Sequence, residues 1–156
     1  MRYFFILVLS LNFLYMNSQD NLPFYEISNY PESYSEAEMV GRMIDGLGFR
    51  YYWATEGLTD KDLNFRLPND SRSSIETVVH IYDLSNMILN TALNLPIEKK
   101  STEGMEFKEI REKTLFSLKE ASDIFKRTKN FNDHTIVFLR DSKKVEYPFW
   151  NQLNGP

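Results

Sequence analysis

The sequence predicts an all-α domain, a bundle of amphipathic helices with a small β-hairpin after the third helix. Three stretches, at about residues 35–57, 73–95 and 105–128, carry apolar residues at steps of three and four, the spacing of a helix with one buried face. Residues 133–148 instead carry β-branched and aromatic residues around a short polar turn, which predicts the hairpin. With 156 residues, the chain is long enough for one domain with a core.

Composition excludes several classes of function. Hydrophobic residues make up 42% of the chain and charged residues 26%, which is typical of a globular protein. The net charge of −4 gives no basic face for nucleic acid, so we expect no nucleic-acid partner. The absence of cysteine excludes a disulfide scaffold, a thiolate zinc site, a cysteine nucleophile and a lipoprotein anchor. Any metal would need histidine, carboxylate and water ligands.

Residues 1–18 have the pattern of a secretory signal peptide. Arg2 precedes a short apolar run that is broken by Ser10 and Asn12 and followed at once by polar residues, too short and too polar for a comfortable membrane span. We expect cleavage near Ser18 or Gln19, export, and no stable membrane anchor afterwards. A core helix or an uncleaved anchor is the alternative. Residues 19–34 are predicted to be an extended N-terminal arm, and residues 35–156 the helical domain.

The first predicted helix has two candidate N-cap residues, Ser33 and Ser35. Three glycines, Gly41, Gly46 and Gly48, lie within its apolar pattern, and each lowers helix propensity by about 1 kcal/mol. We expect a neighbouring helix to approach closely at these glycines. The aromatic run at residues 51–53 is expected to fill the bundle.

The second predicted helix carries the residue of most chemical interest, His80, with Asp83 one turn further on. A histidine on the inner face of a bundle can bind a divalent metal through one ring nitrogen. Asp83 could then orient the other nitrogen or bind a metal-bound water, as a second-shell residue. The alternative is a structural histidine that is hydrogen-bonded at the bundle surface. The other histidine, His134, is expected to be solvated at the start of a strand.

Other catalytic patterns are absent from the sequence. No base adjoins Ser73, Ser74 or Ser85, so a serine nucleophile is unsupported. The glycines of the first helix lack the lysine that a phosphate-binding loop requires. Pro96 is expected to end the second helix, and Pro148 confines the second arm of the hairpin to a sheet edge.

Taken in order, four segments resemble a known family. They are YYWATEGLTDKDLNFRLP at residues 51–68, SRSSIETVVHIYDLS at 71–85, KTLFSLKEAS at 113–122 and YPFWNQLNGP at 147–156. Together they resemble the DinB-like (DinB/YfiT) superfamily, and in particular its exported members in Bacteroidetes-type bacteria. The resemblance covers about residues 36–156. It implies a periplasmic or secreted bacterial protein.

The resemblance also implies a fold and a chemistry. Members form an up-down-down-up four-helix bundle and hold a divalent metal, zinc or nickel, with histidines that face its interior. One of these lies on the second helix, in the place of His80, and the others lie on the fourth helix. Active relatives include metal-dependent thiol S-transferases and amide hydrolases, and pairing through helices as a homodimer is common among them.

The sequence departs from this family at its end. It stops at Pro156, so the bundle is expected to lack most of helix 4 and its histidines, which leaves His80 alone and the metal poorly held. Two hypotheses follow. The chain belongs to a divalent-metal-dependent transferase or hydrolase of the cell envelope, of unspecified substrate, if it is a fragment. Alternatively it is a non-catalytic helical domain, or a partner-binding module, without metal.

Overall fold

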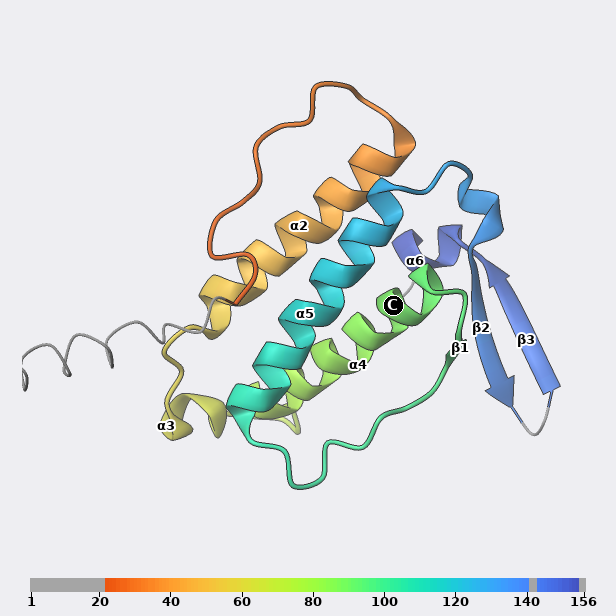
Figure 1. The fold of residues 1–156 in the computed structure, drawn as a ribbon. Helices are drawn as coiled ribbons and strands as arrows, with labels where there is room; N and C mark the ends of the chain where they lie inside the picture. The colour runs from red at the N-terminus through yellow and green to blue at the C-terminus, as the bar shows by residue number, and fades with distance from the viewer. Residues whose placement is uncertain (1–21, 141–142, 155–156) are drawn as a thin grey trace, which may run out of the picture.

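The computed structural model describes residues 22–140 and 143–154 (Figure 1). The predicted signal peptide, residues 1–18, lies outside the described residues. Three long helices dominate, α2 (Glu36–Thr55), α4 (Ser74–Ala92) and α5 (Phe107–Lys126), and α5 packs against both of the others (Figure 1). None of the described helices has the length and apolar character needed to cross a membrane.

Short helical segments connect the larger elements. They are α3 (Asp60–Leu63), the 3-10 helix η1 (Phe131–Asp133) and α6 (Trp150–Asn154). Serine caps explain where two long helices begin. The Ser35 side chain accepts a hydrogen bond from the backbone N–H of Glu38, and Ser73 forms a capping box with Glu76 at the start of α4.

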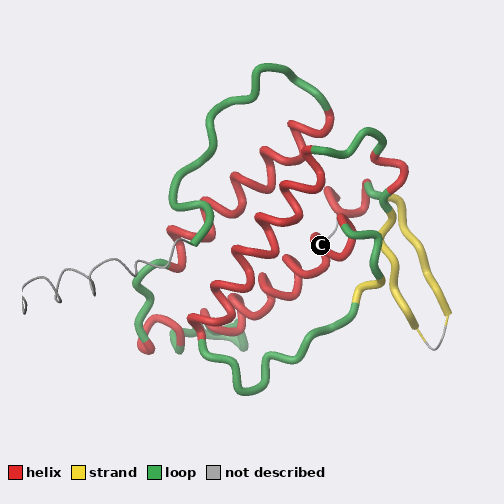
Figure 2. The backbone as a smooth tube through the Cα atoms, in the orientation of Figure 1, coloured by secondary structure: helices red, strands yellow, loops and turns green. Residues whose placement is uncertain are grey.

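The fold class is mixed α/β, so the all-α prediction is wrong. Strands β2 (Thr135–Arg140) and β3 (Lys143–Pro148) form the predicted antiparallel hairpin. A third strand, β1 (Pro96–Ile97), pairs with β2 in parallel, with Pro96 opposite Val137. The resulting three-stranded sheet has the order β1-β2-β3 and lies at one end of the helices (Figure 2).

The third strand arises from the way α4 ends. Asn94 adopts a positive φ of 56°, and the N–H of Leu95 bonds to the carbonyl of Asn90 at 2.8 Å. The Asn90 amide then donates to the carbonyl of Pro96 at 2.9 Å, which holds the chain extended beside β2. The described residues contain three long helices and a sheet, and the predicted four-helix bundle is not found among them.

The core is centred on α5. Its residues Leu115, Leu118 and Phe125 are fully buried, and burial of each such side chain contributes about 1.5–3 kcal/mol. They pack with Ile44 of α2 and Leu89 of α4, among others, in the main cluster. The predicted apolar stripes of the three helices therefore meet at α5.

Close approach explains two of the three glycines of α2. A Cβ atom at Gly41 would lie 2.4 Å from Cγ of Lys126 on α5, as expected for a neighbouring helix. At Gly48 the neighbour is not a helix, because a Cβ atom there would lie 2.5 Å from the ring of Phe24 in residues 22–35. At Gly46 the neighbouring atom is the guanidinium of Arg50 on α2 itself.

A buried ion pair joins α2 to α5. The carboxylate of Asp45 is 4% exposed and lies 2.6 Å from Nζ of Lys126. The hydroxyls of Ser122 and Ser28 donate to the same carboxylate at 2.6 and 2.8 Å. Burial by itself raises the pKa of Asp45, but the hydrogen bonds from Lys126, Ser122 and Ser28 outweigh burial and hold that pKa below its usual value.

Arg111 joins the other ends of the same two helices. Its Nε donates to Thr55 Oγ1 at 2.9 Å, and its Nη2 donates to the carbonyl of Tyr52 at 3.2 Å and pairs with Glu56. The guanidinium also lies over the Tyr52 ring, 4.5 Å from its centroid. Two polar networks therefore fix α2 on α5, one near each end of α5.

Candidate functional site

The two residues predicted from the sequence, His80 and Asp83, do not form a multi-ligand site. Both are half-buried on α4. Val78 and Tyr82 pack against Ile110 of α5, and since a helix turns about 100° per residue, His80 lies on nearly the opposite side of α4. No described residue forms a hydrogen bond or ion pair with the side chain of His80 or Asp83. Within residues 22–140 and 143–154, no group of three or more His, Cys, Asp or Glu could hold a metal ion.

His134, which was expected to be solvated, is buried, with 7% of its surface exposed. Its Nδ1 lies 3.2 Å from the carbonyl of Thr91, and since a carbonyl only accepts, Nδ1 carries the proton. Its Nε2 lies 3.0 Å from Oγ1 of Thr128, a hydroxyl that also lies 3.2 Å from the carbonyl of Ile124. Both ring nitrogens therefore have partners within the protein, and neither is left for a metal or a substrate. The expectation of a solvated ring is wrong because β2 begins against the end of α4.

A pocket of about 480 Å³ lies beside His134; we call it the aromatic pocket. Three stretches of the sequence supply its walls: residues 36–43 of α2, residues 130–135 at η1 and the start of β2, and residues 148–150 at the end of β3 and the start of α6. Its apolar side chains are Met39, Val40, Met43, Phe131, Pro148, Phe149 and Trp150. Phe131 and Phe149 also pack against each other, with ring centroids 4.9 Å apart.

The aromatic pocket also has polar residues in its walls. Glu36, at the first turn of α2, is the one charged residue among the described residues that line it. The side-chain amide of Asn130 donates to Asp133 at 3.1 Å, and its oxygen accepts from the backbone N–H of Asn132. His134 presents its ring rather than its nitrogens. The pocket therefore suits an apolar molecule better than a polar one.

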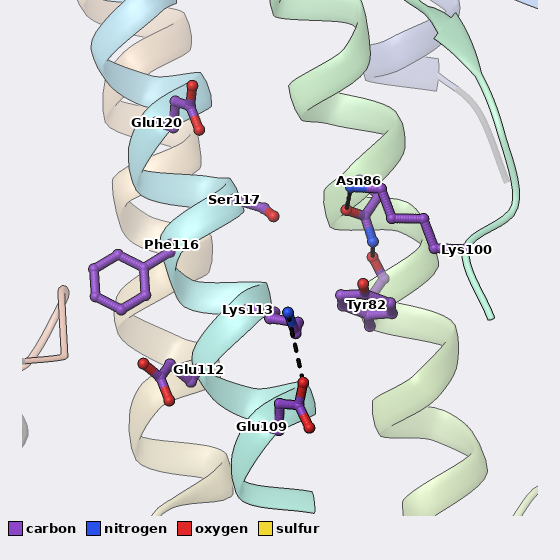
Figure 3. Close-up of a pocket in the computed structure, with 9 residues that line it drawn as sticks. All are labelled: Tyr82, Asn86, Lys100, Glu109, Glu112, Lys113, Phe116, Ser117 and Glu120. Carbon is purple, nitrogen blue, oxygen red and sulfur yellow. Dashed lines mark hydrogen bonds and ion pairs between the residues drawn. The ribbon is translucent and has the colours of Figure 1, made fainter. Parts of the chain in front are cut away.

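A second pocket, of about 400 Å³, lies between α4 and α5 and is polar (Figure 3). Two of its cations are engaged: Lys113 pairs with Glu109 at 3.5 Å, and Lys100 donates to the side chain of Asn86 at 3.0 Å. Glu112 points away from α4 in Figure 3. The carboxylates that line this second pocket therefore do not converge on one point, as the ligands of a metal ion must.

A third pocket, of about 360 Å³, is a groove between α2 and α4 above Leu118 of α5. Tyr51 lines it and is 4% exposed. Within the described part of the chain, its hydroxyl is the one buried side-chain polar atom that has no hydrogen-bond partner. Burial raises the pKa of this hydroxyl and outweighs the opposite effects of the nearby Thr114 hydroxyl and the Arg111 charge. Tyr51 belongs to the aromatic run that was expected to fill the bundle. No local pattern in the sequence signals its unpaired hydroxyl.

Sequence reasoning missed the aromatic pocket because its walls come together only in the folded chain. The one sequence signal is the density of aromatic residues at positions 131 and 149–150. Comparison of the chain with models of known protein families, with curated proteins and with solved structures finds no match. The candidate site therefore rests on its geometry.

Proposed function

We propose that this domain is a non-catalytic binding protein that takes an uncharged, apolar and preferably aromatic small molecule into the aromatic pocket. The observation that carries the proposal is the convergence of Met39 and Met43 of α2 with Phe131, Phe149 and Trp150 around one cavity. Its volume falls in the range of roughly 300–1,000 Å³ that is usual for small-molecule sites.

The chemistry of the walls selects the ligand. Aromatic faces and edges pack well against another ring, and methionine side chains adapt to irregular apolar shapes. Glu36 at the pocket disfavours an anionic ligand because its carboxylate repels another negative charge. Binding without catalysis is proposed because both nitrogens of His134 are engaged, which leaves this pocket without a free imidazole for acid–base work.

Titration calorimetry with two matched probes tests the proposal. The neutral probe is 2-naphthol and the anionic probe is 2-naphthoate, and we expect the neutral probe to bind at least about tenfold more tightly, a difference of about 1.4 kcal/mol. Trp150 is 68% exposed, so Trp150→Ala should weaken binding without unfolding the domain. Trp53→Ala is the control, because Trp53 is also exposed and stacks with Tyr25 instead.

Two results would refute this function. One is the absence of any detectable heat of binding at 2-naphthol concentrations up to about 1 mM. Binding would then be weaker than about 4 kcal/mol. The other is an equal loss of binding in Trp150→Ala and Trp53→Ala, which would place the probe elsewhere.

A second candidate is the metal role that the resemblance to DinB-like proteins implies for His80. The observation that favours it is the absence of any described hydrogen-bond partner for His80, which leaves both imidazole nitrogens available to a metal. After incubation with zinc or nickel, mass spectrometry should then find more bound metal in the unaltered protein than in His80→Ala. Asp123→Asn, an exposed change on α5, is the control. Equal and negligible metal in all three proteins would end this candidate.

A further inference from the structure

The groove between α2 and α4, described above as the third pocket, has apolar walls. α2 and α4 pack on α5 from either side (Figure 1), and Leu118 of α5 lines the groove between them. On both helices the wall residues recur at steps of three and four, so each set lies on one side of its helix. They include Leu47, Arg50 and Ala54 on α2 and Ile81, Leu84 and Ile88 on α4. We call this space the α2–α4 groove, and it shares no lining residue with the aromatic pocket.

Arg50 is the one charged residue among the described residues that line the α2–α4 groove. Its Nη1 atom donates to the carbonyl of Gly46 at 2.9 Å, and no described residue forms an ion pair with it. Since a guanidinium has five donors, most of its hydrogen-bonding capacity is left for a ligand. No aspartate or glutamate of the described chain lines the groove. The groove therefore combines apolar walls with one positive charge that nothing near it balances.

The other polar side chains of the α2–α4 groove offer a ligand much less. The Ser85 hydroxyl donates to the carbonyl of Tyr82 at 2.8 Å, and the Gln152 side chain already accepts a hydrogen bond at 3.2 Å. The Tyr51 hydroxyl is itself buried. Asn151 of α6 is exposed and neutral. Arg50 is therefore the group that selects the polar end of a ligand, and a negative charge is what it selects.

We propose that the α2–α4 groove binds an apolar carboxylic acid of the fatty-acid class. The carboxylate accepts charge-assisted hydrogen bonds from the free donors of Arg50, and burial of the hydrocarbon chain against the apolar walls drives association. Because Arg50 bonds back to Gly46, its guanidinium lies about one turn back along α2, near Leu47. The hydrocarbon chain therefore runs from there toward Ala54. The groove volume of about 360 Å³ falls in the range of roughly 300–1,000 Å³ that is usual for small-molecule sites.

Titration calorimetry at neutral pH with octanoate and 1-octanol tests the charge preference. The two probes carry the same apolar chain, but only octanoate is an anion. We expect octanoate to bind at least about tenfold more tightly, a difference of about 1.4 kcal/mol. This preference is opposite to the one proposed for the aromatic pocket, where Glu36 disfavours an anion. The inference therefore does not depend on the proposed function.

Two variants locate the binding in the α2–α4 groove. Arg50→Gln should weaken octanoate binding by about tenfold and leave 1-octanol binding unchanged, because only the anion loses a partner. Arg72→Gln is the matched control, since Arg72 is also exposed and does not line the groove. Ala54→Phe places a ring in the groove from an exposed position of α2 and should weaken the binding of both probes. Circular dichroism verifies that each variant is folded.

Four results would overturn the proposal. They are no detectable binding of octanoate up to about 10 mM, equal affinity for the two probes, an equal loss in Arg50→Gln and Arg72→Gln, and full octanoate binding by folded Ala54→Phe. Sedimentation velocity of the ligand-free protein tests the other occupant of such a groove. A dimer that Ala54→Phe dissociates would mean that a second copy of the chain covers the groove, and this too would overturn the proposal.

Discussion

Replacing Asp45 by Asn should destabilise the domain through the link between α2 and α5. The substitution keeps the size of the side chain but removes its charge, and so breaks the ion pair with Lys126. Loss of one partner of a buried ion pair costs about 3–5 kcal/mol when the other charge is left buried. The Lys126 side chain is 28% exposed, so its ammonium can regain water. Ser122 keeps a second acceptor, the carbonyl of Gly41 at 3.2 Å. We therefore expect a loss of about 2 kcal/mol.

The effect should depend on pH with a definite sign. Because the folded pKa of Asp45 lies below its usual value, the carboxylate stabilises the fold fully above the unfolded pKa of about 4, and this contribution is lost as the pH falls through the folded pKa. The difference between the original protein and Asp45→Asn should therefore be full at neutral pH and shrink below pH of about 4.

Urea unfolding followed by circular dichroism measures this difference across the pH series. Asp123→Asn is the matched control, because Asp123 pairs with Lys119 at the surface, with 38% and 46% of the two side chains exposed, and such pairs contribute about 0.2–1 kcal/mol at most. A loss at Asp45 no larger than at Asp123, or a difference that does not change with pH, would refute the reasoning.

Three further substitutions give separate tests. Tyr51→Phe removes the unpaired buried hydroxyl and should leave stability unchanged or raise it by up to about 1 kcal/mol in urea unfolding; a clear loss would reveal a hidden partner. Arg111→Lys cannot contact Thr55 and Glu56 at once and should lower the unfolding free energy by about 1–2 kcal/mol; an unchanged value would contradict the network. Gly48→Ala should displace the Phe24 ring and so speed limited proteolysis of residues 22–35. This is expected even though alanine favours the helix by about 1 kcal/mol relative to glycine. An unchanged cleavage rate would contradict the close contact between Gly48 and Phe24.

The helices could be predicted because their signals are local. The apolar steps and the serine caps define α2 at Glu36–Thr55 and α4 at Ser74–Ala92, close to the expected residues 35–57 and 73–95. The hairpin could be predicted for the same reason, since β2 and β3 follow each other around a short turn. Each of these elements is specified within a window of about twenty residues.

The mixed class could not be predicted because it depends on a contact between distant segments. The two residues of β1, Pro96 and Ile97, are too few to show a period. They become a strand only because Asn94 turns the chain and Asn90 holds Pro96 in place. α6 has five residues, and its segment was read as the chain following the hairpin rather than as a helix.

The candidate site was harder still to predict. Periodicity shows that α4 has an apolar face, but it does not fix which neighbours that face meets, and His80 lies nearly opposite the residues that contact α5. His134 is buried because three aromatic rings and the end of α4 surround it. Both placements depend on packing between helices and sheet, which spacing along one element does not encode.

The parallel pairing of β1 with β2 has a consequence for how the domain folds. Pro96 pairs with Val137, and the whole of α5 lies between them in the chain. This pairing therefore closes a long loop, and the conformational entropy lost on closure opposes it. The β2–β3 turn closes a far shorter one. The hairpin should therefore form early and on its own. The attachment of the hairpin to the end of α4, through β1, should wait until α5 has docked. This attachment should be the last part of the fold to form and the first to open.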